Sequence, residues 1–195
     1  MKEKILEGLG FKRDWIYEVI VSTIDQNKQP HAAPIGIFSK DMETISMNLY
    51  PGSETLENIL KTRGAAVNFT SNLELINKSV SGEEILFDSS NKSTIPVIKD
   101  ADAYLMLELD RSVDQQDFVE MDFKISEFEE NQKPQLLNRA EMLFLEALIK
   151  FTKKDFLGED LMLAELCEIQ RVIKKTAPNS KYEKMMEELL EHARD

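Results

Sequence analysis

Apolar and polar residues alternate with a period of two along three successive stretches in the first quarter of the chain. The first runs from Trp15 to Ile24, the second is HAAPIGIF at residues 31–38, and the third is TISMNLY at residues 44–50. The turn-like segments DQNKQP and SKDMET separate them. Such alternation predicts three antiparallel β-strands joined by short turns. Both faces of the first stretch are apolar, which is typical of a strand in a barrel or under a second layer.

Three further strands are predicted after a short helix. The helix spans residues 53–63 and ends at a glycine, a residue type that favours helix C-termini. Strand patterns recur at residues 65–69, 103–113 and 118–128. Residues 71–100 mix short apolar runs with Ser, Asn, Gly and Pro, and therefore predict loops and brief helices. Six strands with turn-like connections predict a small closed or half-open antiparallel barrel.

The period changes to 3.6 after about residue 134, where apolar residues recur every three or four positions. Asn138 is placed to cap the first of three predicted helices, and Pro178 stops the second. The pattern therefore predicts an α+β chain of two domains, a barrel over residues 1–131 and a three-helix subdomain over residues 132–195.

Composition and charge limit the cellular compartment and the binding partners that we expect for this protein. The single cysteine, Cys167, excludes an internal disulfide and favours a reducing, cytoplasmic environment. No apolar run approaches the ~20 residues of a membrane-spanning helix. Nearly all of the net charge of −12 falls on residues 1–131, because residues 132–195 hold 11 basic and 12 acidic side chains. Such an acidic surface repels nucleic acid, so we expect neither nucleic-acid nor membrane partners.

Two hydroxyl groups lie at the predicted N-terminus of the short helix. Ser53 occupies the N-cap position and Thr55 the second helical position. Unpaired backbone N–H groups and the positive end of the helix dipole make such a terminus suitable for a phosphate monoester. The alternative is plain helix capping, which requires no ligand and is the commoner use of these residue types.

The second strand is unusual because three of its residues have almost no side chain and a fourth cannot donate a backbone hydrogen bond. These residues are Ala32, Ala33 and Gly36, together with Pro34. A flat ligand could approach such a strand closely, although an edge strand or a bulge beside a crowded interface explains it as well. Asn48 and Asn68 lie in otherwise apolar strands, where a buried amide needs a partner from the backbone or from the polar edge of a ring.

Other kinds of chemistry find little support in the sequence. The two histidines, His31 and His192, are far apart and have no nearby histidine or cysteine partner, so we expect no metal site. The GxGxxG, GxxxxGK[ST] and GxSxG motifs are missing, which disfavours the common dinucleotide folds, P-loop enzymes and serine hydrolases. His31 is the best candidate for a proton donor, and catalytic residues stay unassigned.

Two stretches together resemble a known family. VIVSTIDQNKQPHAAPIGIF and ISMNLYPGSETLENILKTRGAAVNF are similar to the split barrel that binds flavin mononucleotide (FMN) in flavin reductases and pyridoxamine-phosphate-oxidase-like proteins. That family has a Ser-x-Thr turn into a short helix and a strand that ends in Val-Asn. NRAEMLFLEALIKFTK is similar to a signature of an uncharacterised, mainly archaeal flavin-binding family with a C-terminal helical subdomain. The resemblance implies an antiparallel six-stranded split β-barrel followed by a three-helix subdomain.

The resemblance also implies a set of cofactor-binding residues. Ser53 and Thr55 would hold the flavin phosphate, the small-residue strand would line the ring, and the end of the third strand would flank the ribityl chain. The complete implied set is His31, Ala32, Ala33, Pro34, Ile35, Asn48, Leu49, Tyr50, Ser53, Thr55 and Asn68.

The sequence and the resemblance together predict a cytoplasmic homodimer that binds FMN non-covalently. We expect it to act as a flavin-dependent oxidoreductase, similar to flavin reductases, on a substrate that the sequence does not identify. The alternative is a non-catalytic flavin-binding or dimerisation module, and a deazaflavin is an alternative ligand for the same groove.

Overall fold

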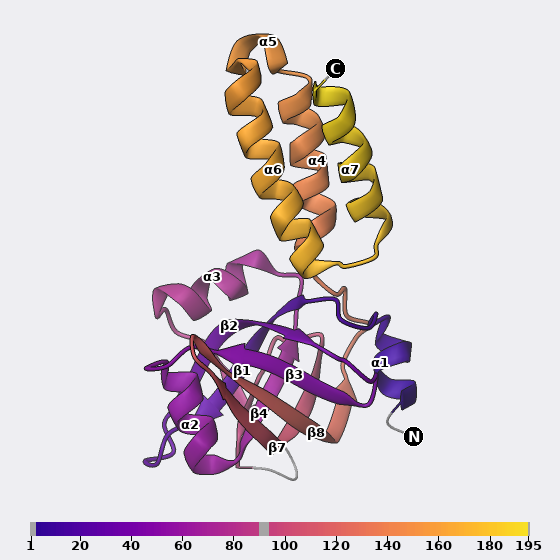
Figure 1. The fold of residues 1–195 in the computed structure, drawn as a ribbon. Helices are drawn as coiled ribbons and strands as arrows, with labels where there is room; N and C mark the ends of the chain where they lie inside the picture. The colour runs from indigo at the N-terminus through magenta and orange to yellow at the C-terminus, as the bar shows by residue number, and fades with distance from the viewer. Residues whose placement is uncertain (1–2, 90–93, 195) are drawn as a thin grey trace. The chain divides into compact units, whose positions relative to one another are not determined.

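The structure is a computed structural model that describes residues 3–89 and 94–194 (Figure 1). The described chain divides into two compact units. One extends to Leu137 and contains the described strands apart from Tyr17, and the other begins at Asn138 and also includes residues 14–17.

Six antiparallel strands form a closed barrel in the first unit. They are β1 (Tyr17–Ile24), β2 (Pro30–Phe38), β3 (Thr44–Leu49), β4 (Gly64–Phe69), β7 (Ala103–Gln115) and β8 (Phe118–Glu130). Their order around the barrel is β1-β2-β3-β8-β7-β4. The predicted six-stranded antiparallel barrel and the α+β class are therefore confirmed.

β1 is buried on both faces, as its pattern predicts. Val21 lies opposite Val67 of β4, and the neighbouring Ile20 lies opposite Asn68, with all four residues 0% exposed. Because side chains alternate across a strand, Val21 and Ile20 occupy opposite faces of the barrel wall. The outer face is covered by a cluster that contains Ile20, Leu75, Ile98 and Ala101.

Several short elements surround the barrel. They are α1 (Glu3–Leu9), α2 (Glu54–Thr62), α3 (Leu73–Ser81), β5 (Phe87–Ser89) and β6 (Pro96–Ile98). Asn72 caps α3 by accepting hydrogen bonds from two backbone N–H groups, and Gly82 ends it at a φ of 73°. β5 and β6 pair into a separate two-stranded sheet. Within the segment 71–100, for which loops and brief helices are predicted, residues 90–93 lie outside the described ranges. The described part includes one helix of nine residues and a strand pair that the pattern does not reveal.

β2 and β3 separate over most of their length. Their described pairing is confined to Ile37 with Met47 and Phe38 with Ser46, whereas β3 pairs with β8 through all six of its residues. The part of β2 before Ile37 therefore leaves the register with β3. We call this stretch, where β2 lies outside the described pairing with β3, the β2–β3 opening.

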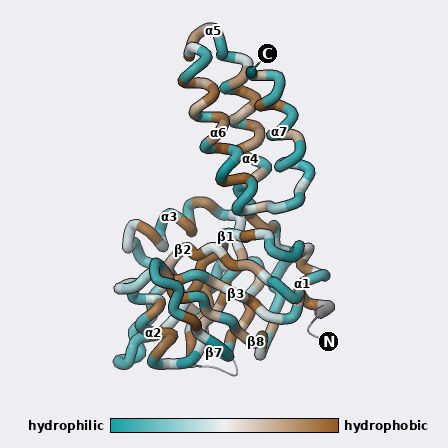
Figure 2. The backbone as a smooth tube through the Cα atoms, in the orientation of Figure 1, coloured by the Kyte–Doolittle hydropathy of each residue, from teal (hydrophilic) through white to brown (hydrophobic). Residues whose placement is uncertain are grey.

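The second unit is a helical bundle. Its helices are α4 (Arg139–Phe151), α5 (Lys154–Leu157), α6 (Glu159–Thr176) and α7 (Lys181–Arg194). Figure 2 shows how hydrophilic and hydrophobic residues alternate along the three long helices, and the hydrophobic ones meet in a core that includes Phe144, Leu166 and Met186. The predicted count of three helices is not confirmed, because α5 adds a fourth after Thr152. Gly158, at a φ of 79°, separates α5 from α6.

Asn138 has the capping role that the sequence predicts. Its Oδ1 accepts a hydrogen bond from the backbone N–H of Ala140 at 2.8 Å. Its Nδ2 donates to the carbonyl oxygens of Ile16 and Thr176, both at 2.8 Å, and so joins the start of α4 to the end of α6. Among the helices of the described ranges, none has the length and apolar character required to cross a bilayer.

Candidate functional site

The N-terminus of α2 is built from a glycine turn and a serine cap. Gly52 has a φ of 82°, a conformation that favours glycine, and the N–H of Ser53 donates to the carbonyl of Tyr50 at 3.2 Å. Ser53 adopts the extended N-cap conformation, and its Oγ accepts from the N–H of Leu56 at 3.4 Å. This capping bond is long, and the first N–H groups of any helix have no acceptor within the helix. Plain capping and anion binding are therefore compatible at this terminus.

Thr55 connects the start of α2 to the start of β2. Thr55 is 1% exposed, and its Oγ1 lies 3.2 Å from Nε2 of His31. The other ring nitrogen of His31, Nδ1, lies 3.3 Å from Oε2 of Glu54, whose side chain is 61% exposed. The first turn of α2 and the first residues of β2 thus form one polar cluster, which we call the His31 cluster and define as His31, Glu54 and Thr55.

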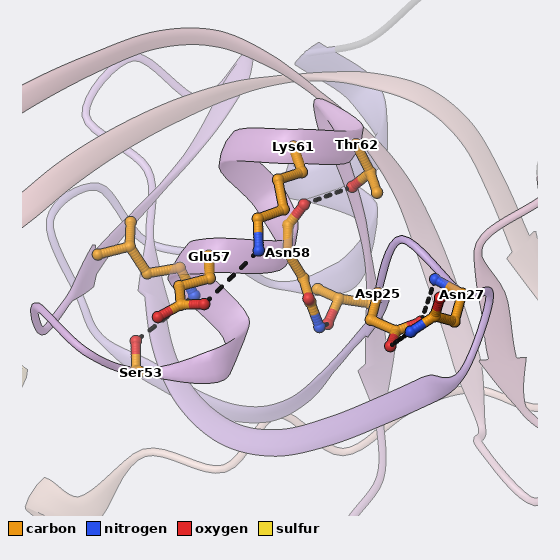
Figure 3. A network of polar contacts seen from close by, with 9 residues as sticks. Asp25, Asn27, Ser53, Glu57, Asn58, Lys61 and Thr62 are labelled. Atoms are coloured by element: carbon orange, nitrogen blue, oxygen red, sulfur yellow. Dashed lines mark hydrogen bonds and ion pairs between the residues drawn. The ribbon is translucent and has the colours of Figure 1, made fainter.

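The rest of α2 carries its charges in local pairs. Figure 3 shows Lys61 Nζ turned to Glu57 Oε2, at 3.6 Å, and Thr62 Oγ1 donating to the carbonyl of Asn58 at 2.8 Å. The buried Nδ2 of Asn58 donates to Thr23 Oγ1 at 3.1 Å, which attaches α2 to β1. Glu57 is thus paired with a lysine on its own helix, whereas Glu54, the other acidic residue of the first turn, belongs to the His31 cluster.

The small-residue part of β2 is open to ligands at its surface. Ala32, Ala33 and Ile35 are partly exposed and Pro34 is exposed, in contrast to the buried Ile37 further along the strand. Because β2 has left β3 here, its backbone groups on this side do not belong to the β2–β3 ladder. A planar ligand could therefore approach the backbone without displacing large side chains.

Asn48 adjoins this opening, because it is the first residue of β3 beyond the described pairs with β2. Continuing the β2–β3 register would place Asn48 opposite Gly36, in the part of β2 that has separated. The Oδ1 atom of Asn48 is buried and has no hydrogen-bond partner among the residues that the structure describes. Leaving such an acceptor unpaired costs about 1–3 kcal/mol, so this atom is suited to a donor on a ligand. The next two residues differ from Asn48 in their exposure, since Leu49 is buried in the core and Tyr50 is 64% exposed.

Asn68 lies away from this opening, in the barrel wall. It is 0% exposed, and its Nδ2 lies within 3.3 Å of three acceptors on β1 and β4. Its Oδ1 accepts a hydrogen bond from the backbone N–H of Ile98 at 2.8 Å. The partner that the sequence requires for this amide is therefore supplied by the protein itself.

A small cavity adjoins the beginning of β2. It has a volume of about 200 Å³ and is lined by His31 and Ala32 of β2 and by Lys78 and Ser79 of α3. Lys78 Nζ lies 3.8 Å from Glu74 Oε1. Among residues 3–89 and 94–194, no group of three or more metal-ligating side chains is close enough to hold a metal ion.

Comparison with known proteins gives consistent matches. A family model described as "Protein of unknown function (DUF447) N-terminal domain" matches residues 17–132. The uncharacterised protein MJ1453 of Methanocaldococcus jannaschii is 32% identical over 148 residues, which cover 71% of this chain and 74% of that protein.

Solved structures resemble the chain over nearly all of its length or over about 70% of it. The FMN-bound protein MM1853 of Methanosarcina mazei, from the same DUF447 family, is 26% identical with a TM-score of 0.58, over 96% of this chain and 99% of that one. The flavin reductase PheA2 has a TM-score of 0.51 and 16% identity, over 70% of this chain and 97% of its own. The likeness to PheA2 concerns the fold alone.

Proposed function

The chain belongs to the DUF447 family, and from this premise and the geometry of the barrel we propose that it binds FMN non-covalently between β2, β3 and the N-terminus of α2. Three features support the proposal: an FMN-bound relative that matches nearly the whole chain, an anion-compatible helix terminus, and an opened strand pair with a buried unpaired acceptor.

The phosphate would bind at the start of α2. The first backbone N–H groups of the helix point out of its N-terminus, where the dipole favours negative charge. Ser53 Oγ and Thr55 Oγ1 would add hydroxyl donors on the same turn. Glu54 is negative, and its contact with His31 holds its carboxylate on the imidazole side of the site. His31 would therefore orient both Thr55 and Glu54 around the phosphate.

The flavin ring and the ribityl chain would lie along the opening between β2 and β3. The backbone of Ala33, Pro34 and Ile35 would line the ring, with Ala32 beside it. The unpaired Oδ1 of Asn48 carries the proposal, because it would accept a hydrogen bond from an N–H or O–H group of the cofactor. Leu49 would contribute only its backbone, and the exposed ring of Tyr50 is free to cover the ribityl chain. We leave Asn68 out of the ligand set because its amide is already hydrogen bonded within the wall.

We further propose that the protein is a cytoplasmic homodimer, with residues 1–131 as the FMN-binding split-barrel domain and residues 132–195 as a helical subdomain. Bound FMN would supply the transfer of hydride or single electrons, and the chain would supply position and electrostatics. The cavity of about 200 Å³ beside His31 offers room for part of a reaction partner. A flavin-dependent oxidoreductase is therefore the function that the site supports best.

An FMN titration of two matched variants tests the phosphate site. The double variant Ser53→Gly/Thr55→Val keeps a tolerated N-cap and the shape of the buried threonine, but removes both hydroxyls. Charge-assisted hydrogen bonds contribute about 1.5–3 kcal/mol each, so FMN affinity should fall at least ~100-fold. Riboflavin affinity, measured by the same fluorescence quenching, should change less than about threefold, because riboflavin lacks the phosphate.

Asn72→Gly is the control, because it alters the N-cap of α3 in the same way at a helix outside the proposed site. Equal losses for FMN and riboflavin would show that the phosphate binds elsewhere. Reduction of the bound flavin by NADH or NADPH without oxygen then separates the enzyme from a non-catalytic flavin-binding module. If neither donor bleaches the flavin absorption, the reductase-like activity is wrong while FMN binding stands.

A further inference from the structure

A second, larger cavity lies at the opposite end of α2. It has a volume of about 570 Å³ and is bordered by Arg63, which follows α2, by Ile95, and by Met106, Glu108 and Glu127 of the β7–β8 hairpin. A nine-residue helix is about 13 Å long, so this cavity is well separated from Ser53. Small-molecule sites typically measure about 300–1,000 Å³. The cavity is thus large enough for a ligand of its own.

A β-bulge turns Glu127 toward this cavity. Met106 of β7 lies opposite Glu127, but the next residue, Leu107, lies opposite Ile125, so Ser126 is an extra residue in β8. Ser126 Oγ donates to the carbonyl of Met106 at 3.2 Å and holds the bulge. Strict alternation would place Glu127 on the same face as the buried Ile125, inside the barrel. The bulge places it on the outer face instead, and bulges commonly redirect side chains in this way near functional sites.

The carboxylate of Glu127, at the border of this cavity, is only partly hydrogen bonded within the described residues. Its Oε1 lies 3.3 Å from the hydroxyl of Tyr104, which also donates to Glu129 Oε2 at 2.6 Å. Its Oε2 is buried and has no partner within the described part of the chain. A buried carboxylate oxygen without a donor is unfavourable, and the nearby carboxylate of Glu129 adds repulsion. A cationic hydrogen-bond donor bound in the cavity at the Glu127 carboxylate would supply the missing hydrogen bond and reduce the repulsion from Glu129.

The remaining walls define the rest of the ligand. Ile24, Ile95 and Met106 are each less than 9% exposed and belong to one apolar cluster that forms the floor. Arg63, held in the left-handed conformation at a φ of 64°, uses Nη2 to donate to the carbonyl of Leu109 at 3.0 Å. Its position at the end of α2 is thus fixed by the backbone. The border of the cavity carries two carboxylates, of Glu108 and Glu127, and the single guanidinium of Arg63 among the described residues.

We propose that this cavity is a binding site for a small organic cation, with a primary ammonium group on an apolar body. The ammonium group donates to the Glu127 carboxylate, and the apolar body packs on Ile95 and Met106. The site is distinct from the proposed FMN site, so its ligand binds whether or not flavin is present.

Calorimetric titration of the full chain with benzylamine tests the proposal, with benzyl alcohol as the neutral probe of the same shape. Benzylamine should bind once per chain and benzyl alcohol at least ten times more weakly. Glu127→Gln should weaken benzylamine binding by ~10-fold to ~100-fold, the range expected when a charge-assisted hydrogen bond is lost. Glu130→Gln, on the same strand and exposed, is the matched control and should change nothing.

Methyl NMR of the unaltered protein locates the probe without any substitution. Resonances of Ile24 and Ile95 should shift on addition of benzylamine, with and without saturating FMN. The proposal is overturned if benzylamine does not bind, if benzyl alcohol binds equally well, if Glu127→Gln binds as tightly as the unaltered chain, or if those two methyl groups do not respond. Because the readout does not use flavin, failure here leaves the FMN proposal untouched, and the reverse also holds.

Discussion

Replacing Asn68 by alanine tests whether this buried amide stabilises the barrel or binds the cofactor. The amide donates to Ile20 O at 3.1 Å and to Ser22 Oγ at 2.9 Å, and it accepts from the N–H of Ile98 at 2.8 Å. Each bond contributes about 0.5–1.5 kcal/mol, and the Ile98 N–H left unpaired in a buried position costs about 1–3 kcal/mol more. The free energy of unfolding of the barrel should therefore fall by roughly 3–5 kcal/mol. FMN affinity of the folded variant should change less than about threefold.

Urea unfolding followed by far-ultraviolet circular dichroism measures the loss, and FMN fluorescence quenching at low temperature measures the affinity. Trp15 fluorescence reports the helical unit in the same sample, because its indole donates to the carbonyl of Pro178 at 3.2 Å there. Asn58→Ala is the matched control, since this buried amide makes one side-chain bond, to Thr23, and should cost about 1 kcal/mol. If Asn68→Ala were as stable as the unaltered chain, or lost FMN binding while folded, the assignment of Asn68 to the wall would be refuted.

Two further predictions concern the outer face of the barrel. Gly64→Ala would place a Cβ 2.6 Å from Ile95 Cδ1 and 3.1 Å from the Leu107 carbonyl oxygen, so it should lower the free energy of unfolding by about 1–3 kcal/mol. In a double-mutant cycle, Ile95→Val should recover part of this loss because it removes Cδ1. Strictly additive effects of the two substitutions would contradict the contact. Burial and the hydrogen bond to Glu129 raise the pKa of the Tyr104 phenol above its ordinary value. The native state therefore keeps this proton more tightly than the unfolded chain, a stabilisation present below pH ~10 and lost as pH rises beyond it. Melting temperatures should fall more steeply above pH ~10 for the unaltered chain than for Tyr104→Phe, and parallel curves would be inconsistent with this reasoning.

The barrel strands are predictable because their signal is local. Alternation over residues 15–50 depends on side chains that neighbour each other in sequence, and a strand with a buried face has to show it. The same holds for the cap at Asn138, where one residue supplies the hydrogen bond. The predicted end of α2 at a glycine is wrong, because Arg63 adopts the left-handed C-cap conformation at a φ of 64° and Gly64 is already the first residue of β4. β5 and β6 are only three residues long and are stabilised by pairing with each other, so no periodic pattern could reveal them.

Only some of the residues of the candidate site could be predicted from the sequence. Residue types identify Ser53 as a cap and the small residues of β2 as an open surface. The contact between His31 and Thr55 spans 24 positions, and the alternation pattern contains nothing that relates them. Asn48 and Asn68 look alike in the sequence, since each is an amide in an apolar strand. Only the fold separates them, because the wall supplies partners to Asn68, whereas Oδ1 of Asn48 has no partner among residues 3–89 and 94–194.

The bulge in β8 shows how a single extra residue can change the function of a strand. Met121, Phe123 and Ile125 recur at every second position of β8, and the structure buries all three. The next position in that series is Glu127, and a carboxylate there would point into the apolar barrel at a cost of several kcal/mol. Inserting Ser126 shifts the alternation, so that Phe128 lies opposite the buried Leu105 and Glu127 lies opposite Met106 on the outer face. The break in the alternation of β8 therefore marks the point where the strand departs from regular packing. It places the Glu127 side chain on the outer face of the barrel, at the border of the cavity of about 570 Å³.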